Sequence, residues 1–187
     1  GMIGMGQARI FVKGKLFAKF MDYTDVEVDG VVEADSAINC NVVSNDKVIF
    51  NGGHASIVGG KVYGCAGIEV QNLGNDAFIK TEVHVGVHKK IKIKIAELEK
   101  QMLLNNINAG IKQIEQMMGS AADGMNLEEK KLALVRAKIE KTAELTEDKE
   151  ELERLKGIVE RSTGATVQVL EHVYPNVEVC INNSKLV

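Results

Sequence analysis

The chain has 187 residues, of which 26 are acidic and 23 basic, so its formal net charge is −3. This balance gives no reason to expect nucleic acid binding, which depends on basic surfaces. The sequence contains no run of about 18 apolar residues, so no membrane span is expected, and its start lacks the apolar run of a secretory signal. The cysteines Cys40, Cys65 and Cys180 form no C-x-x-C pair, which argues for reduced thiols in a cytoplasm and against zinc.

Residues 7 to about 86 repeat a short phrase in which Val, Ile or Phe alternates with other residues and a Gly or Asn follows. The copies cover residues 10–14, 26–30, 48–52 and 68–72, and their last residues lie 16, 22 and 20 positions apart. Alternation with a period of two predicts strands with one buried face, and the closing Gly or Asn permits a turn. A repeat of about 20 residues predicts a parallel β-helix. The alternative, an antiparallel sandwich or meander, would need several tight two-residue turns, and Asp29-Gly30 and Asn51-Gly52 are the only Asp-Gly or Asn-Gly dipeptides in this stretch.

Residues 88–162 follow a different pattern, with 15 basic and 14 acidic side chains among 75 positions. Apolar residues recur there at steps of three and four, as on the buried stripe of a helix. One slip follows Met102, which predicts a stutter in any coiled coil. The alternation over residues 90–95 also permits a short strand at the start. These apolar residues are Ile91, Ile95, Leu98, Met102, Leu104, Ile107, Ile111, Ile114 and Met118 in the first arm, and Leu132, Val135, Ile139, Leu145, Leu152, Leu155 and Val159 in the second.

The strand pattern returns after Gly164, in residues 166–169 and 176–179. We therefore expect a mainly β protein with a helical insert and two domains. The first is a discontinuous parallel β-helix of residues 7–87 and 164–187. The second, residues 88–163, is an antiparallel helical hairpin, because a short loop joins its two arms.

The sequence offers few candidate functional residues. We expect no catalytic residue, metal ligand or cofactor. His84 and His88 have helical metal-site spacing, but the residues around His84 alternate as a strand does. The candidate interaction surface is a basic cluster at the start of the insert together with two methionines near its tip. A solvated helix start is the simpler explanation of the cluster, and contact with an anionic surface is the alternative. The candidate residues are Lys89, Lys90, Lys92, Lys94, Met118 and Met125.

Three segments, residues 53–63, 67–75 and 80–87, resemble the bacterial flagellar assembly protein A family, as does the Val-Tyr-Pro-Asn-Val tail around Pro175. The resemblance covers nearly the whole chain. It implies a right-handed parallel β-helix with a projecting coiled coil, in a cytoplasmic bacterial protein linked to flagellar assembly or polar organisation. The family supplies no catalytic residues to carry over. Members often have Asp-Pro where this chain has His88-Lys89, which leaves the start of the helix open.

We accordingly predict a non-enzymatic structural or interaction module. The helical arm is expected to bind a protein partner or a second copy of the chain, so a homo-oligomer is expected. The alternative is a β-helix scaffold that polymerises end to end, resembling bactofilins, because unpaired strand edges promote such contacts. An acyltransferase-type β-helix enzyme is disfavoured, since an apolar residue at every sixth position is missing.

Overall fold

The computed structural model describes residues 1–118, 127–182 and 184–186. The chain divides into two compact units, one formed by Gly1–His88 with Gly157–Val187 and the other by Lys89–Lys156. The first unit is a parallel β-solenoid and the second is helical. Neither described helix carries an apolar stretch long enough to cross a bilayer.

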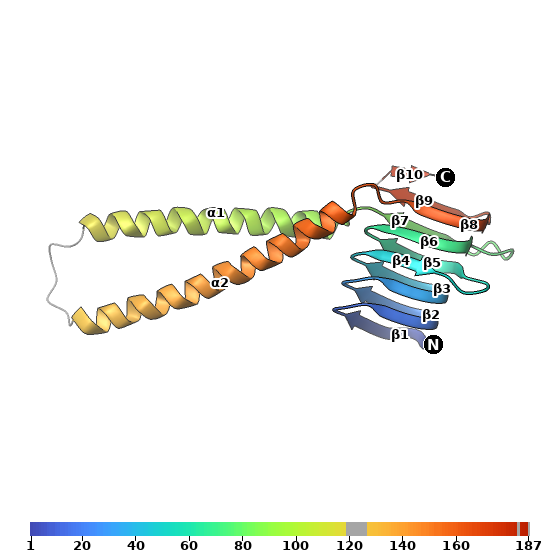
Figure 1. The fold of residues 1–187 in the computed structure, drawn as a ribbon, viewed down its shortest axis with the longest axis horizontal. Coiled ribbons are helices and arrows are strands. Elements are labelled where there is room, and N and C mark those ends of the chain that lie inside the picture. Colours follow the sequence, from blue (N-terminus) through green and yellow to red (C-terminus); the bar gives the residue numbers. More distant parts are fainter. Residues whose placement is uncertain (119–126, 183, 187) are drawn as a thin grey trace. The chain divides into compact units, whose positions relative to one another are not determined.

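The solenoid consists of strands that stack in layers, with β1 at one end and β10 at the other (Figure 1). Its strands are β1 (Met2–Val12), β2 (Leu16–Val28), β3 (Val32–Ser44), β4 (Lys47–Phe50), β5 (Ser56–Gly64), β6 (Gly67–Leu73), β7 (Thr81–Val85), β8 (Val167–Val173), β9 (Val177–Ile181) and β10 (Ser184–Leu186). Parallel pairs join β1 to β2, β2 to β3, and β3 to both β4 and β5. β4 then pairs with β6 and β5 with β7. The expected parallel β-solenoid is thereby confirmed.

The segment that follows the insert joins the same stack. β8 pairs in parallel with β6, and β9 pairs in parallel with β7, although about 90 residues separate each pair in sequence. β10 then turns back and pairs antiparallel with β9. The two ends of the insert are therefore held in neighbouring layers, since β7 precedes it and β8 follows it.

The core is built from columns of apolar side chains that stack from layer to layer. One column runs through Ile10, Val26, Val42, Val62, Val83 and Val179. Val42, Val62 and Val83 are fully buried. Small β-branched side chains suit this narrow interior, because each packs on the residue at the same register position in the next layer.

The predicted alignment of the four phrases was half right. Residues 10–14 do lie over 26–30, and residues 48 and 49 share a column with 68 and 69. Val26, however, pairs with Val42, whereas Val48 pairs with Val32. The second and third phrases thus occupy different faces of the solenoid. The 22-residue spacing between them therefore does not correspond to one turn of the solenoid.

Sharp corners between faces require unusual backbone conformations. Tyr23 and Asn39 adopt positive φ, and so do Gly59 and Gly60 at the same corner in the layer next to Asn39. Asn tolerates this region and Gly adopts it freely. A Cβ atom on Gly60 would collide with the carbonyl oxygen of Cys40, so this corner needs glycine for space as well as for φ.

Strand β1 begins at Met2, five residues before the predicted start of the β-pattern at residue 7. The missed residues include Gly4, Met5 and Gly6, which break the alternation. Their register against β2 shifts between Ile3 and Ala8, where Met5 and Gly6 have positive φ. A bulge of this kind hides a strand from a period-two pattern.

The insert forms two helices, α1 (Lys89–Met118) and α2 (Leu127–Arg161). The alternation over residues 90–95 is therefore helical, and the helix begins at Lys89, where the sequence had left its start open. In α1 the residues Ile91, Ile95, Leu98 and Met102 are buried or half-buried, at steps of four, three and four. Beyond the predicted slip the pattern changes, and Leu104 is exposed.

Candidate functional site

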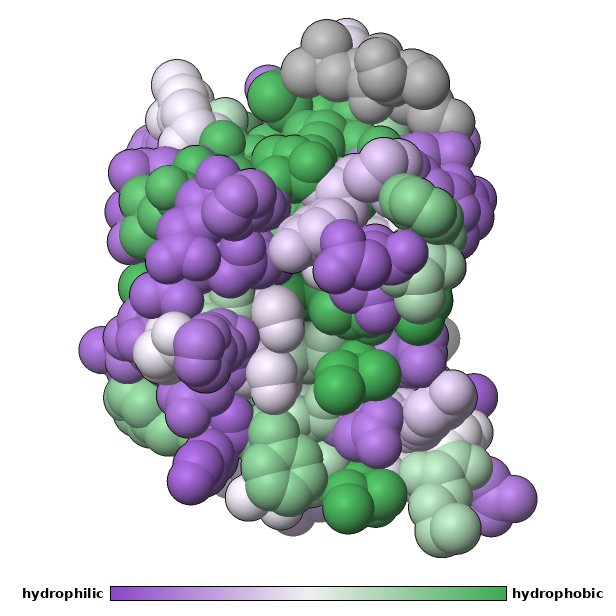
Figure 2. All heavy atoms as spheres, turned by 90° about the vertical axis from the view of Figure 1, so that its right-hand side faces the viewer, coloured by the Kyte–Doolittle hydropathy of each residue, from purple (hydrophilic) through white to green (hydrophobic). Residues whose placement is uncertain are grey.

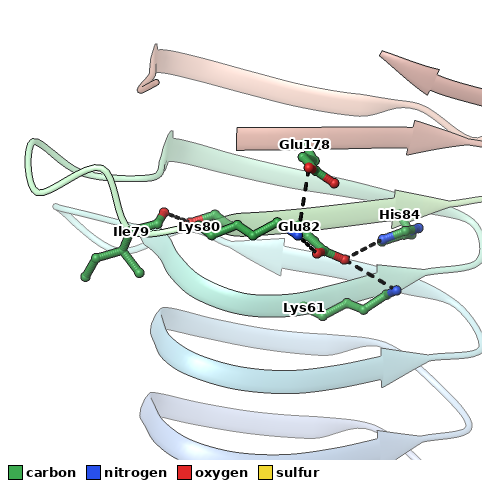
Figure 3. A network of polar contacts seen from close by, with 7 residues as sticks. Lys61, Ile79, Lys80, Glu82, His84 and Glu178 are labelled. Carbon is green, nitrogen blue, oxygen red and sulfur yellow. Dashed lines mark hydrogen bonds and ion pairs between the residues drawn. The ribbon is translucent and has the colours of Figure 1, made fainter. Parts of the chain in front are cut away.

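A polar network crosses the outer face of the solenoid over β5, β7 and β9 (Figure 3). Lys61, Glu82 and Glu178 occupy the same register position in these three strands. Lys80 lies just before β7 and donates a hydrogen bond of 2.6 Å to Glu82 Oε1. Its Nζ atom lies 3.8 Å from Glu178 Oε1, and Lys61 Nζ lies 3.5 Å from Glu82 Oε2. The carboxylate of Glu82 is thus the centre of the network.

Buried polar groups fix the backbone beneath this network. The Thr81 hydroxyl is fully buried; it accepts a hydrogen bond of 2.8 Å from the Gly59 backbone N–H and donates one of 3.0 Å to the Ile79 carbonyl. The hydroxyl therefore satisfies groups from two layers that the corner leaves unpaired. This arrangement holds Lys80 and Glu82 at a defined place on the solenoid face.

The network shifts the ionisation of its members. The hydrogen bond from Lys80, together with the charges of Lys80 and Lys61, lowers the pKa of Glu82 to about 2. Burial lowers the pKa of His84, and the Lys61 charge adds to this effect while Glu82 opposes it. His84 Nε2 lies 3.6 Å from Glu82 Oε2, beyond hydrogen-bond range. The His84 ring stacks on the Tyr63 ring, with 5.8 Å between the ring centroids. A neutral His84 is the expected form near neutral pH.

The network lies beside an open hollow of about 490 Å³ whose lining includes Tyr23, Asn39 and Asn41. Lys61, Lys80 and Glu82 also line it, but their charges already pair with one another. The Glu82 carboxylate has a lowered pKa, the opposite of what a general acid working near neutral pH needs. These ion pairs are therefore better suited to holding neighbouring layers of the solenoid together than to proton transfer.

The four candidate lysines lie in the first two turns of α1 and are all exposed. The helix separates them into two groups, because residues three or four apart share a side. Lys90 and Lys94 lie on one side, and Lys89 and Lys92 on another. The first turn of α1 contains no acidic residue, so these charges oppose the helix dipole. The four lysines are thus spread over two sides of α1, and their role as an interaction surface stays a prediction.

The two candidate methionines are not placed with the lysines. Met118 is the last residue of α1, but its side chain is not among those that the structure describes, and Met125 lies outside the described residues. Their assignment to an interaction surface stays a prediction.

The thiols and the histidines form no metal centre within the described residues, because no three His, Cys, Asp or Glu side chains there are placed to share an ion. Cys40 and Cys65 are buried free thiols and Cys180 is half-buried. Burial raises the pKa of Cys40 and of Cys65, which keeps both thiols protonated and unreactive.

Sequence reasoning missed the Lys61–Glu82–Glu178 network, although a signal for it exists. Each of the three residues directly precedes a Val of the buried column that contains Val62, Val83 and Val179. Charged residues at one fixed offset from a stacked apolar position predict a ladder of charges on the outer face. Finding it required the register between layers, which the phrase alignment did not supply.

Comparison with protein families matched residues 1–187 to the model described as "FapA: Flagellar Assembly Protein A beta solenoid domain". Neither the curated proteins nor the solved structures that were compared gave a match to the chain. The match extends over every residue, including both helices and the returning strands. It also agrees with the parallel stacking of β1 to β9. The chain therefore belongs to the Flagellar Assembly Protein A β-solenoid domain family.

Proposed function

We propose that the chain is a non-enzymatic structural module of a cytoplasmic bacterial protein that acts in flagellar assembly or polar organisation. In this proposal the solenoid, wound right-handed, is a rigid stem, and α1 and α2 form an antiparallel coiled coil that associates with a second copy of the chain. Family membership supports the link to flagellar assembly. Register-stacked layers support the role of stem, because each layer is fixed by its neighbours.

The observation that carries the role of the helices is uneven burial along them. Near the start of α1 and the end of α2, Leu98, Leu152 and Leu155 are buried. Lys156 Nζ lies 3.0 Å from Glu99 Oε1, so the two helices meet there. A hydrogen bond from Arg154 lowers the pKa of Glu151, and the charge of Lys94 on α1 adds to the shift.

Further along, apolar side chains on the same predicted stripes are exposed. Leu104, Val135 and Ile139 are 49%, 52% and 64% exposed. Exposed apolar side chains at coiled-coil spacing are those that a partner helix covers. The part of the stripe that the chain itself leaves uncovered is therefore the proposed contact.

A second copy suits this stripe because of charge. Residues 88–162 hold 15 basic and 14 acidic side chains, so two such segments do not repel each other. Two-fold pairing would bring the same apolar stripe of each copy together, as in most homodimers. The exposed charges on either side of the stripe would then set the register of the pair.

The test is the mass of the chain in solution over a range of concentrations. We expect a dimer that dissociates on dilution, and we expect Leu104→Glu with Ile139→Glu to weaken association at least about tenfold, since each change buries a charge in the contact. Ile38→Glu, at a half-exposed position of the solenoid, is the matched control. A wild-type chain that stays monomeric would reject self-association. Capture of a different protein by the helices, lost in the same double variant, would assign the stripe to that partner instead.

A second candidate is a scaffold that polymerises end to end, resembling bactofilins. It is favoured by the edge of β1, for which the described residues include no strand partner on the side away from β2. It is disfavoured by β10, which pairs antiparallel with β9 at the other end. Electron micrographs of concentrated protein distinguish the two, because filaments that persist in the Leu104→Glu, Ile139→Glu variant would require contacts through the solenoid ends.

A further inference from the structure

The outer face of the solenoid that carries the polar network also carries an ordered column of charges. One residue from each of five successive layers occupies the same register position there. The signs along this column are positive, negative, neutral, positive and negative. On the side of the solenoid that Figure 2 shows, green apolar and purple hydrophilic side chains are intermixed, so the regular order belongs to the face drawn in Figure 3. We call the five residues the charge column, and from β1 to β7 they are Arg9, Asp25, Asn41, Lys61 and Glu82.

The charge column is complementary to its own reverse. Reversal about Asn41 exchanges Arg9 with Glu82. It also exchanges Asp25 with Lys61, so every charge meets one of opposite sign. A second copy that is turned end over end, about a two-fold axis along β3, presents the column in this reversed order. Layers repeat at about 4.8 Å in both copies, so the match holds over the whole column. A two-fold axis at Asp25 or Lys61 would instead place that charge against its own copy.

The charges of the column are open to solvent and already alternate within one copy. The side chains of Arg9 and Asp25 are 77% and 50% exposed, and Arg9 Nε lies 3.7 Å from Asp25 Oδ2. Those of Lys61 and Glu82 are 48% and 24% exposed, with 3.5 Å between Lys61 Nζ and Glu82 Oε2. Asn41 is exposed between the two pairs. A second copy in the reversed order would give each charge a further opposite neighbour and leave the existing pairs in place.

The shape of the face follows the same two-fold axis. In the layer of β2, Tyr23 is 51% exposed at the corner of the solenoid. In the layer of β5 this corner carries Gly59 and Gly60, which have no side chains, and the hollow of about 490 Å³ opens beside Gly60. A two-fold axis along β3 exchanges these two layers. The exposed ring of Tyr23 would therefore enter the hollow of the other copy, where Asn39 and Asn41 offer amide groups to its hydroxyl.

The neighbouring column of the same face would be covered in a matching way. It consists of Phe11, Glu27, Val43, Tyr63 and His84. Phe11 is 75% exposed. Under the same reversal it lies against His84, whose ring stacks on Tyr63 in its own copy, and aromatic rings pack favourably on one another. Glu27 then lies against the Tyr63 hydroxyl, which can donate a hydrogen bond to its carboxylate.

We propose that this face of the solenoid binds the same face of a second copy, with the two solenoids antiparallel around a two-fold axis along β3. The contact is separate from the helical stripe of the proposed self-association and uses neither end of the stack. The charge column has no net charge, so a strongly acidic or strongly basic partner would gain little from it.

The contact is small. Layers about 4.8 Å apart and about five residues per strand cover roughly 300 Å² of each copy. Contacts of this size associate weakly. Dimers joined by the helical stripe should therefore pair further through their solenoid faces only at high concentration.

The test uses the Leu104→Glu, Ile139→Glu chain as the parent, because it lacks the helical contact. Sedimentation equilibrium up to about 1 mM should show a dimer of this parent with a Kd of about 0.1 mM. Asp25→Lys and Lys61→Glu each place like charges opposite one another at two points of the contact, and each should weaken it at least about tenfold. Lys47→Glu, at an exposed position of β4, is the matched control and should leave the Kd unchanged.

Mixing the two charge variants tests the register of the contact. In a mixed dimer the lysine that replaces Asp25 faces the glutamate that replaces Lys61, and the native pair faces each other at the second point. The mixture should therefore regain a Kd within about threefold of the parent value, which a folding defect in either chain would not allow. Tyr23→Asn removes the ring but keeps a residue type that tolerates positive φ, and it should weaken the dimer about tenfold.

Three outcomes would overturn the proposal. A parent chain that stays monomeric at about 1 mM would reject the contact. Unchanged dimerisation of the Asp25→Lys chain, with its fold intact by circular dichroism, would place the contact elsewhere. A mixture that associates no more tightly than its components would reject the two-fold axis along β3. Failure of the helical stripe reads differently, because Leu104→Glu with Ile139→Glu would then leave the wild-type affinity unchanged while the charge variants still weaken it.

Discussion

The solenoid and the helical insert keep their structure in different ways. In the solenoid, side chains such as Val42 and Val62 are fully buried, and each packs between the residues at the same register position in the layers on both sides. In the insert, Leu98 and Leu155 are buried whereas Leu103 and Val135 are exposed. A solenoid layer therefore depends on its two neighbours, while most described positions of the helices depend on local helix geometry. The same kind of change should be damaging in one unit and mild in the other.

Removal of the returning strands should have the largest effect. A chain that ends after Thr163 lacks β8, β9 and β10, so β6 and β7 lose their partners on one side. Val70, Leu73 and Val83, all fully buried, would then form an open apolar edge. Such an edge pairs with other chains, and we expect aggregation measurable by light scattering.

A chain that ends after Asn182 is the matched control for this truncation, because it retains β8 and β9 and loses only β10 among the strands. It should stay folded with a lower melting temperature. A truncation after Thr163 that unfolds cooperatively and stays monomeric would show that the returning strands are dispensable. In that case the stack would tolerate an open end better than the comparison of the two units implies.

A buried charge should separate the two units more sharply than any other single substitution. Val62→Asp places an unpaired carboxylate in a fully buried column and should cost about 4 kcal/mol or more, enough to unfold a marginal layer. Ile93→Asp, at a half-exposed position of α1 outside the predicted stripe, should change the free energy of unfolding by about 0.5 kcal/mol or less. Chemical denaturation followed by circular dichroism measures both. Equal effects would remove the distinction between the units.

The sequence predicts well those features that depend on neighbouring residues. Alternation in the strands and steps of three and four in the helices are local consequences of backbone geometry, so element types were predictable. The start of the insert was open from sequence alone, because Lys90 to Ile95 alternate like a strand. The described parts of this charged stretch, residues 89–118 and 127–161, are helical, and the short alternation follows the surrounding helix.

Features that depend on register were not predictable in this way. Val26 pairs with Val42, and Val48 with Val32, but both faces carry the same apolar phrase, so similarity alone does not assign a phrase to a face. The pair Lys80 and Glu178 is joined only because β9 returns beside β7 after the insert. The four candidate lysines, although neighbours in sequence, lie on two sides of α1, and their assignment to an interaction surface stays a prediction.

Glycine substitutions should give effects of opposite sign in the two kinds of structure. Gly60→Ala requires a Cβ where the Cys40 carbonyl oxygen lies, at a φ of 73°, and should destabilise the chain by roughly 2 kcal/mol. In α2 a Cβ on Gly157 would meet only Arg161 Nη1 at 3.6 Å, and Gly157→Ala should stabilise the helix by up to about 1 kcal/mol. Melting temperatures of the two variants test the pair. A stabilising Gly60→Ala would contradict the corner geometry.

The smallest expected effect concerns the charges that join β5, β7 and β9. The pKa of Glu82 is about 2 in the folded chain against a usual value of 4.5. Folding therefore favours the carboxylate, and its contribution is complete above about pH 4.5 and is lost as pH falls through that value towards 2. Because the network lies on the surface, we expect a contribution of about 1 kcal/mol.

Glu82→Gln should remove this part of the pH dependence, so that wild type and variant converge in stability as the pH approaches 2. Glu27→Gln, at an exposed outward position of β2, is the control and should leave the wild-type profile unchanged. His84 adds a component of the same sign at higher pH, since its lowered pKa makes the unfolded chain take up the proton first as pH falls below about 6.5. His84→Gln separates the two components. If Glu82→Gln keeps the full wild-type slope below pH 4.5, the Lys80–Glu82–Glu178 contacts do not stabilise the junction between β7 and the returning β9.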